Sequence, residues 1–137
     1  MLRTDLIRAV QAYLRSNYTG PVTIHAEEDD AEIEPPYAIV RATIAEDMGA
    51  DQADIWDINL VVAVMHDADA TTIETAEAQA ATVFATLHDP APVITALAGS
   101  GIAASCFHRL TSEAGSDGMQ WQHFHAFRVI ASPAAND

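Results

Sequence analysis

The segment at residues 55–65, IWDINLVVAVM, constrains the fold more than any other part of the chain. Its first half alternates apolar and polar side chains, with Asp57 and Asn59 on the polar side, which is typical of a strand with one buried face. Its second half is apolar at every position, so we expect both faces to be buried there. The side chains expected on the buried face are Trp56, Ile58, Leu60, Val62 and Val64.

An alanine-rich helix is expected directly after this strand, over residues 71–88, TTIETAEAQAATVFATLH. Thr71 and Glu74 have the spacing of a capping box, in which each side chain accepts from an amide at the helix start. Asp89 and Pro90 are expected to end the helix, because the residue before a proline disfavours helical geometry. The segment 92–99, PVITALAG, is expected to add one or two further turns.

The N-terminal third predicts one helix and two strands. Apolar residues recur at helical spacing through the first four turns, up to residues 17–20, and Pro21 follows. They are Leu2, Leu6, Ile7, Val10, Tyr13 and Leu14. Residues 22–25 and 37–45 are expected to be strands, the second starting after Pro35 and Pro36.

Two alternating runs at the C-terminal end, residues 102–112 and 119–131, predict a hairpin. Gly115 and the pair Asp117–Gly118 supply residues suited to the turn. A turn centred near Ser116 would place Arg109 opposite His123 and Phe107 opposite His125. In that register His108 lies on the opposite face of the sheet from both histidines, since facing residues share a side.

The expected order of elements is α-β-β-β-α-β-β, with strands mainly in hairpins and two helices to cover one face. This pattern predicts an α+β fold: a two-layer sandwich with a mainly antiparallel sheet and the helices packed on one face. Residues 1–137 are long enough for a single domain. Residues 132–137 are polar and are expected to be a frayed tail.

Charge restricts the classes of partner. The chain has 20 acidic residues, six arginines and no lysine, for a formal net charge of −14. Binding to nucleic acid or to an anionic membrane needs basic residues facing phosphates, so we expect neither partner. The longest strongly apolar run, residues 60–65, is too short to span a bilayer. Charged residues interrupt the N-terminal segment, so no signal peptide is expected and the chain should stay in the cytoplasm in which it is made.

The strand at 119–131 contains His123 and His125, whose spacing puts both imidazoles on one face, as in half of a metal site. A metal site would usually bring a third ligand, and no third ligand is predicted on that face. Ordinary packing or a subunit contact is the competing interpretation, and we expect no metal or cofactor. Cys106, the only cysteine, lies in an alternating run and is expected to be a buried apolar residue. No catalytic motif occurs, and we expect no enzyme.

Several local features together resemble one protein family. They are the N-terminal helix LIRAVQAYLRSN, the Pro-Pro-Tyr start of PPYAIVRATI, the apolar strand running into the alanine-rich helix, and a final hairpin with Asp-Gly before FHAFRVIA. In this order, over nearly the whole chain, they resemble the tail terminator and tail-completion (head–tail joining) proteins of long-tailed bacteriophages. The lack of lysine and the acidic composition depart from that family's usual composition.

The resemblance implies a structural protein of a phage or prophage virion tail, assembled in the bacterial cytoplasm. It implies a ring of identical subunits, commonly a hexamer, that caps the tail tube protein and offers the docking surface for the head–tail connector protein. DNA would pass through such a ring, and carboxylates lining the channel would repel it. Two acidic loops are candidates for that lining: Glu27, Glu28, Asp29, Asp30, Glu32 and Glu34 in the first, and Glu46, Asp47, Asp51 and Asp54 in the second. The first loop lacks the spacing of a calcium-binding loop. The alternative is a small metal-dependent enzyme or ligand-binding domain that uses the His123 and His125 face.

Overall fold

The computed structural model describes residues 2–27, 34–47 and 55–133. Within these ranges, three helices and five strands form an α+β fold in the order α-β-β-β-α-α-β-β. The helices are α1 (Leu2–Asn17), α2 (Ile73–Ala85) and α3 (Pro90–Gly99). The strands are β1 (Thr23–Ala26), β2 (Tyr37–Asp47), β3 (Trp56–Asp67), β4 (Ile102–Ser116) and β5 (Gln120–Pro133). The predicted fold class is confirmed.

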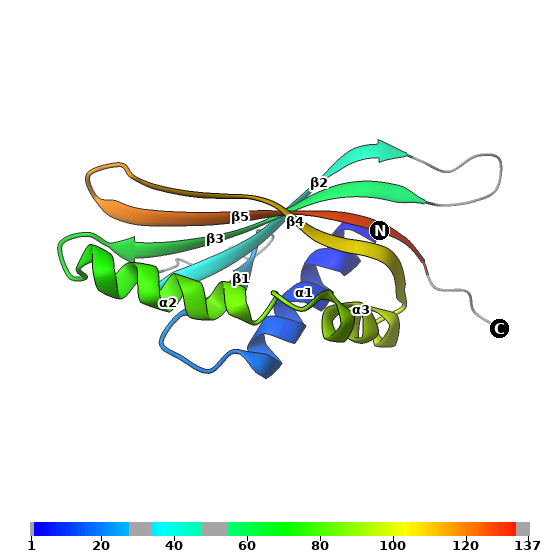
Figure 1. Ribbon diagram of the computed structural model, residues 1–137, viewed down its shortest axis with the longest axis horizontal. Coiled ribbons are helices and arrows are strands. Elements are labelled where there is room, and N and C mark those ends of the chain that lie inside the picture. The colour runs from blue at the N-terminus through cyan, green and yellow to red at the C-terminus, as the bar shows by residue number, and fades with distance from the viewer. Residues whose placement is uncertain (1, 28–33, 48–54, 134–137) are drawn as a thin grey trace.

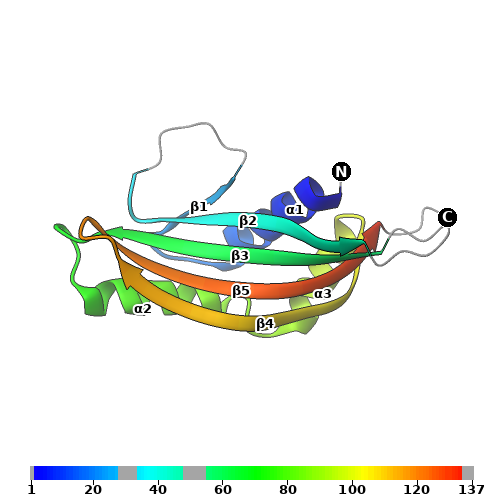
Figure 2. The same cartoon turned by 90° about the horizontal axis from the view of Figure 1, so that it is seen from above.

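The five strands make one sheet in the spatial order β1-β2-β3-β5-β4. Only β1 and β2 pair in parallel, and the other three pairs are antiparallel. All three helices lie on the same side of this sheet (Figures 1 and 2). The long strand β3 is central, between β2 and β5. Its second half, from Val62 to His66, is buried on both faces, because Ala63 and Met65 pack with side chains of β2 and β5 on the helix-free face.

The main hydrophobic core fills the space between the helices and the sheet. Helix α1 contributes Leu6, Val10 and Leu14, which are fully buried against β1 and β2. The helix-facing residues of β3 are the even-numbered ones from Ile58 to His66. Beside them on β5 are the odd-numbered residues from Trp121 to Val129. The predicted face of the 119–131 strand, which includes His123 and His125, therefore points toward the helices.

The start of α2 differs from the predicted capping box. The N-cap is Thr72, whose Oγ1 accepts from the amide of Thr75. Thr71 precedes the helix, and its carbonyl accepts a hydrogen bond from the Trp121 indole. The segment after Pro90 is also a separate helix rather than an extension, because Asp89 caps it and Pro90 takes the first turn, where no amide donor is needed.

The β4–β5 hairpin has a different register from the predicted one. The strands continue to Ser116 and Gln120, so the turn lies at residues 117–119, and Ala114 pairs with His123 while Ser112 pairs with His125. Two irregularities interrupt β4, one at Ala104/Cys106 and one at Arg109/Thr111. His108 pairs with Arg128 and lies on the helix-free side, so its predicted face is confirmed although the predicted partners of His123 and His125 are wrong.

Most of the candidate channel-lining acids lie outside the described residues: Glu28, Asp29, Asp30, Glu32, Asp51 and Asp54. Glu34 is exposed. Glu27 forms an ion pair with Arg3 of α1. Glu46 and Asp47 belong to the end of β2 rather than to a loop, because their backbones pair with the start of β3. At the C-terminus, β5 includes residues 132 and 133 of the expected tail, and the remaining four lie outside the described residues.

Candidate functional site

The most distinctive polar groups of the described chain lie where α2 crosses β3 and β5. His66, at the end of β3, is 1% exposed, and its Nε2 lies 2.7 Å from Oε1 of Gln79 on α2. Trp121 Nε1 donates to the Thr71 carbonyl at 2.8 Å, just before α2 begins. These two contacts attach the helix to the sheet through specific polar pairs. His66 was missed from the sequence, although it continues the alternation of Val62 and Val64.

His125 packs flat against Phe84 of α2, with ring centroids 3.5 Å apart and an interplanar angle of 9°. Burial lowers the pKa of His125 to about 4, and the positive charge of Arg109 and the neighbouring His123 add to this effect. The imidazole is therefore uncharged at neutral pH. A neutral ring stacked on a phenyl ring is a packing contact, as the competing interpretation of the sequence expected.

His123 lies between His66 and His125 on the same face of the sheet. Burial lowers its pKa, His66 lowers it further, and Glu77 of α2 raises it. The Nδ1 atoms of His123 and His66 are buried and have no hydrogen-bond partner within the described chain. Over residues 2–27, 34–47 and 55–133, no group of three or more His, Cys, Asp or Glu side chains is placed to hold a metal ion. His123 and His125 therefore share one face, and the described residues do not complete a three-ligand site around them.

A cleft of about 290 Å³ opens beside this histidine group, between α2 and the β4–β5 pair. Its walls are mainly aromatic and aliphatic, and its polar lining groups are His88, Arg109 and His125. The irregularity at Arg109/Thr111 creates this arrangement, because it shifts the alternation of β4 and turns Arg109 and Phe107 toward the helices. The predicted register already placed both residues on the face of His123 and His125, and that face is confirmed, although their pairing partners differ.

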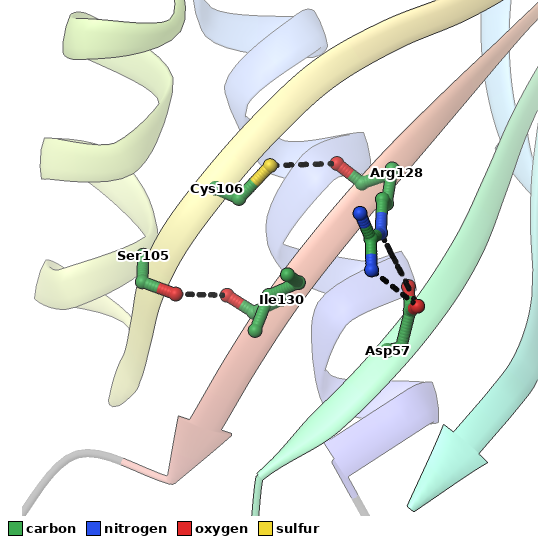
Figure 3. Close-up of polar contacts among 5 residues, drawn as sticks. All are labelled: Asp57, Ser105, Cys106, Arg128 and Ile130. Atoms are coloured by element: carbon green, nitrogen blue, oxygen red, sulfur yellow. Dashed lines mark hydrogen bonds and ion pairs between the residues drawn. The ribbon is translucent and has the colours of Figure 1, made fainter. Parts of the chain in front are cut away.

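The opposite face of the sheet carries a charged pair that joins β3 and β5. The Arg128 guanidinium donates to both carboxylate oxygens of Asp57, at 3.0–3.2 Å (Figure 3). Asp57 therefore forms an ion pair that links the two strands. Beside it, the Cys106 thiol lies 3.8 Å from the Arg128 carbonyl. Cys106 is half-buried on this helix-free face, so the expectation of a fully buried thiol is wrong.

No family model matches this chain, and no curated protein sequence matches it. The fold of this chain does match a solved structure. One chain of the structure described as "Virion of native gene transfer agent (GTA) particle" matches with a TM-score of 0.57 and 16% sequence identity. The match covers 94% of this chain and 90% of that chain. The two chains share a fold. No helix within the described ranges is long and apolar enough to cross a membrane.

Proposed function

We propose that this chain is a structural, non-enzymatic subunit of a phage-like particle. The observation that carries the proposal is the fold shared, over nearly the full length of both chains, with a component of a gene transfer agent virion. The coverage matters because a partial match would be compatible with a common supersecondary motif, whereas this one spans 94% of the chain. The partners of such a subunit are other virion proteins.

Within that class, we propose the role of a tail terminator. Copies of the chain would form a ring, commonly a hexamer, that caps the tail tube protein and presents a surface to the head–tail connector protein. A ring subunit needs separate surfaces for its neighbours, for the tube, for the connector and for the channel. A stiff sheet with loops at both ends and helices on one side offers such surfaces, because loops on a rigid scaffold can vary independently.

The acidic segments at residues 27–34 and 46–54 are proposed to line the channel, where carboxylates would repel passing DNA. A reconstruction of the ring by electron cryomicroscopy tests this assignment. Both segments facing the outside of the ring would refute it. Neutralising the acids of one segment to Asn and Gln should then leave assembly intact and increase retention of DNA in the channel.

The terminator role is tested by deleting the gene from the bacterium that carries it and imaging the particles. We expect tails of uncontrolled length and unattached heads, with both defects corrected by supplying the gene in trans. Normal particles after deletion would refute the role. Negative-stain microscopy of the purified protein across a concentration series adds an independent measurement, in which closed rings of uniform diameter with a central hole support the proposal.

The alternative, a metal-dependent enzyme or ligand-binding domain built on His123 and His125, has weaker support. His125 is stacked on Phe84, and the described residues bring no third ligand to the pair. No second function is proposed on this face.

A further inference from the structure

The cleft between α2 and the β4–β5 pair has the composition of a binding surface. Its floor and walls include three phenyl rings, those of Phe84, Phe107 and Phe127, with Phe107 and Phe127 centroids 5.0 Å apart. Ala81 on α2 leaves room above them, since its side chain ends at Cβ. An aromatic, largely apolar cleft of this size accepts a flexible apolar side chain.

Arg109 at the edge of this cleft has no carboxylate partner in the part of the chain that the structure describes. Arg3 and Arg128, by comparison, are paired with Glu27 and Asp57, so Arg109 brings an uncompensated positive charge to the cleft. The positive charge of Arg109 lowers the pKa of His125, which lines the same cleft. An apolar cleft with an unpaired cation fits an occupant that combines an apolar side chain with a carboxylate.

The tip of the β4–β5 hairpin carries that combination. Met119 is 75% exposed, the most exposed large apolar side chain of the described residues. Beside it, the Asp117 carboxylate accepts from the amides of Met119 and Gln120 at 2.9 and 2.8 Å, and these bonds lower its pKa. The tip is therefore ionised and pre-ordered, and the Met119 carbonyl is also fixed by the amide of Ala68 at 3.0 Å. A pre-ordered segment loses less conformational entropy when it docks.

We propose that the hairpin tip of one copy docks in the α2–β4–β5 cleft of a second copy. Met119 enters the aromatic cleft, where its thioether contacts the phenyl rings, and Asp117 lies toward Arg109. The two surfaces are different parts of the same chain, so the contact is heterologous and propagates from copy to copy until it closes a ring. The inference rests on the ring proposed above and names its subunit contact.

The test uses three variants of the full chain, with association measured by sedimentation velocity across a concentration series. Arg109→Glu disables the cleft and Met119→Asp disables the tip, and each should weaken self-association by about 30-fold or more. Arg41→Glu is the matched control, because it makes the same charge change on an exposed residue of β2 paired with Val61, away from both surfaces. Circular dichroism melts confirm that each variant is folded.

Mixing the two disabled variants gives the sharper result. The intact tip of Arg109→Glu should dock in the intact cleft of Met119→Asp, and the product has no further complementary pair. We therefore expect heterodimers and no larger species. Wild-type assembly by either single variant would overturn the inference, and so would a mixture that forms rings. Neither outcome would contradict the proposed role in a phage-like particle, because the gene deletion tests that role separately.

A second measurement, disulfide cross-linking, tests the same contact if the wild-type chain assembles only on a template and does not self-associate alone. In a Cys106→Ser background, Met119→Cys and Ala81→Cys proteins are mixed at high concentration under mild oxidation. The inference expects a disulfide-linked heterodimer from this mixture and none when Ala81→Cys is replaced by Arg41→Cys. Equal cross-linking in both mixtures, or none in either, would overturn it.

Discussion

The imidazole of His125 lies flat on the ring of Phe84, at a centroid separation of 3.5 Å, and so joins the final strand to helix α2. Together with the His66–Gln79 and Trp121–Thr71 hydrogen bonds, this stack fixes the helix over the sheet. The same geometry keeps the imidazole uncharged. The group that seemed suited to a metal from its spacing is therefore, in the fold, part of the packing of a helix.

The stack predicts a pH-dependent stability. The pKa of His125 is lowered from 6.5 to about 4 and that of His123 is also lowered, so as pH falls below 6.5 the unfolded chain takes up protons that the folded chain does not. The contribution of these histidines to the free energy of unfolding should therefore be complete above pH 6.5 and should decrease as the pH falls toward 4. The loss is at most about 1.4 kcal/mol per pH unit for a fully shielded group, and less for the partly exposed His125.

His125→Phe isolates this contribution, since it keeps a ring on Phe84 and removes the titrating group. Urea unfolding at about pH 7.5 and pH 5 should show a smaller pH difference in the variant than in the wild type. His108→Phe, on the helix-free face, is the control and should retain the wild-type difference. An unchanged pH difference in His125→Phe would contradict the assignment.

Metal binding separates the two interpretations of the His123 and His125 face. We expect no stoichiometric binding of zinc or nickel by the purified protein at micromolar metal, because the described residues place no group of three ligands where a metal ion could be held. Bound metal is measured by plasma mass spectrometry after dialysis. Tight binding at one ion per chain that disappears in the His123→Ala, His125→Ala double variant would restore the metal-site alternative.

Helix capping gives a prediction in which two adjacent threonines differ. Thr72→Ala removes the hydroxyl that accepts from the Thr75 amide and should lower the free energy of unfolding by about 1 kcal/mol. Thr71→Ala is the matched control and should cost less than about 0.5 kcal/mol, since Thr71 contributes its backbone carbonyl to Trp121. Chemical denaturation of both variants measures the difference. If the two variants lose the same free energy of unfolding, Thr72 is not the N-cap that stabilises this helix.

The Asp57–Arg128 pair is expected to stabilise the sheet only modestly. Its fork geometry is favourable, but the Arg128 side chain is 44% exposed, so water and salt screen the attraction. A double-mutant cycle with Asp57→Asn and Arg128→Gln should give a coupling energy of about 0.5–1 kcal/mol that falls in 1 M salt. Zero coupling at low salt would mean that the pair is not populated in solution.

Local patterns were sufficient to predict most of the elements and the fold class, although α3 was predicted as an extension of α2. The alternation from Trp56 to Val64 and the helical spacing of Leu6, Val10 and Leu14 each describe one element and its buried face, because side-chain direction repeats with the period of the backbone. The face of His123 and His125 follows from the same rule. These properties depend on neighbours in the chain, so the sequence is enough to predict them.

The pairing of elements depends on contacts between residues far apart in the chain, and only the folded structure determines it. Alternation specifies which face a residue takes but not which residue of the next strand it meets, so the hairpin register and the irregularity at Arg109/Thr111 were not predictable. That irregularity turns Arg109 and Phe107 toward α2, and the packing of α2 then buries His125 against Phe84. The cleft, the position of Arg109 at its edge and the uncharged imidazole of His125 all arise from these long-range contacts between separate elements.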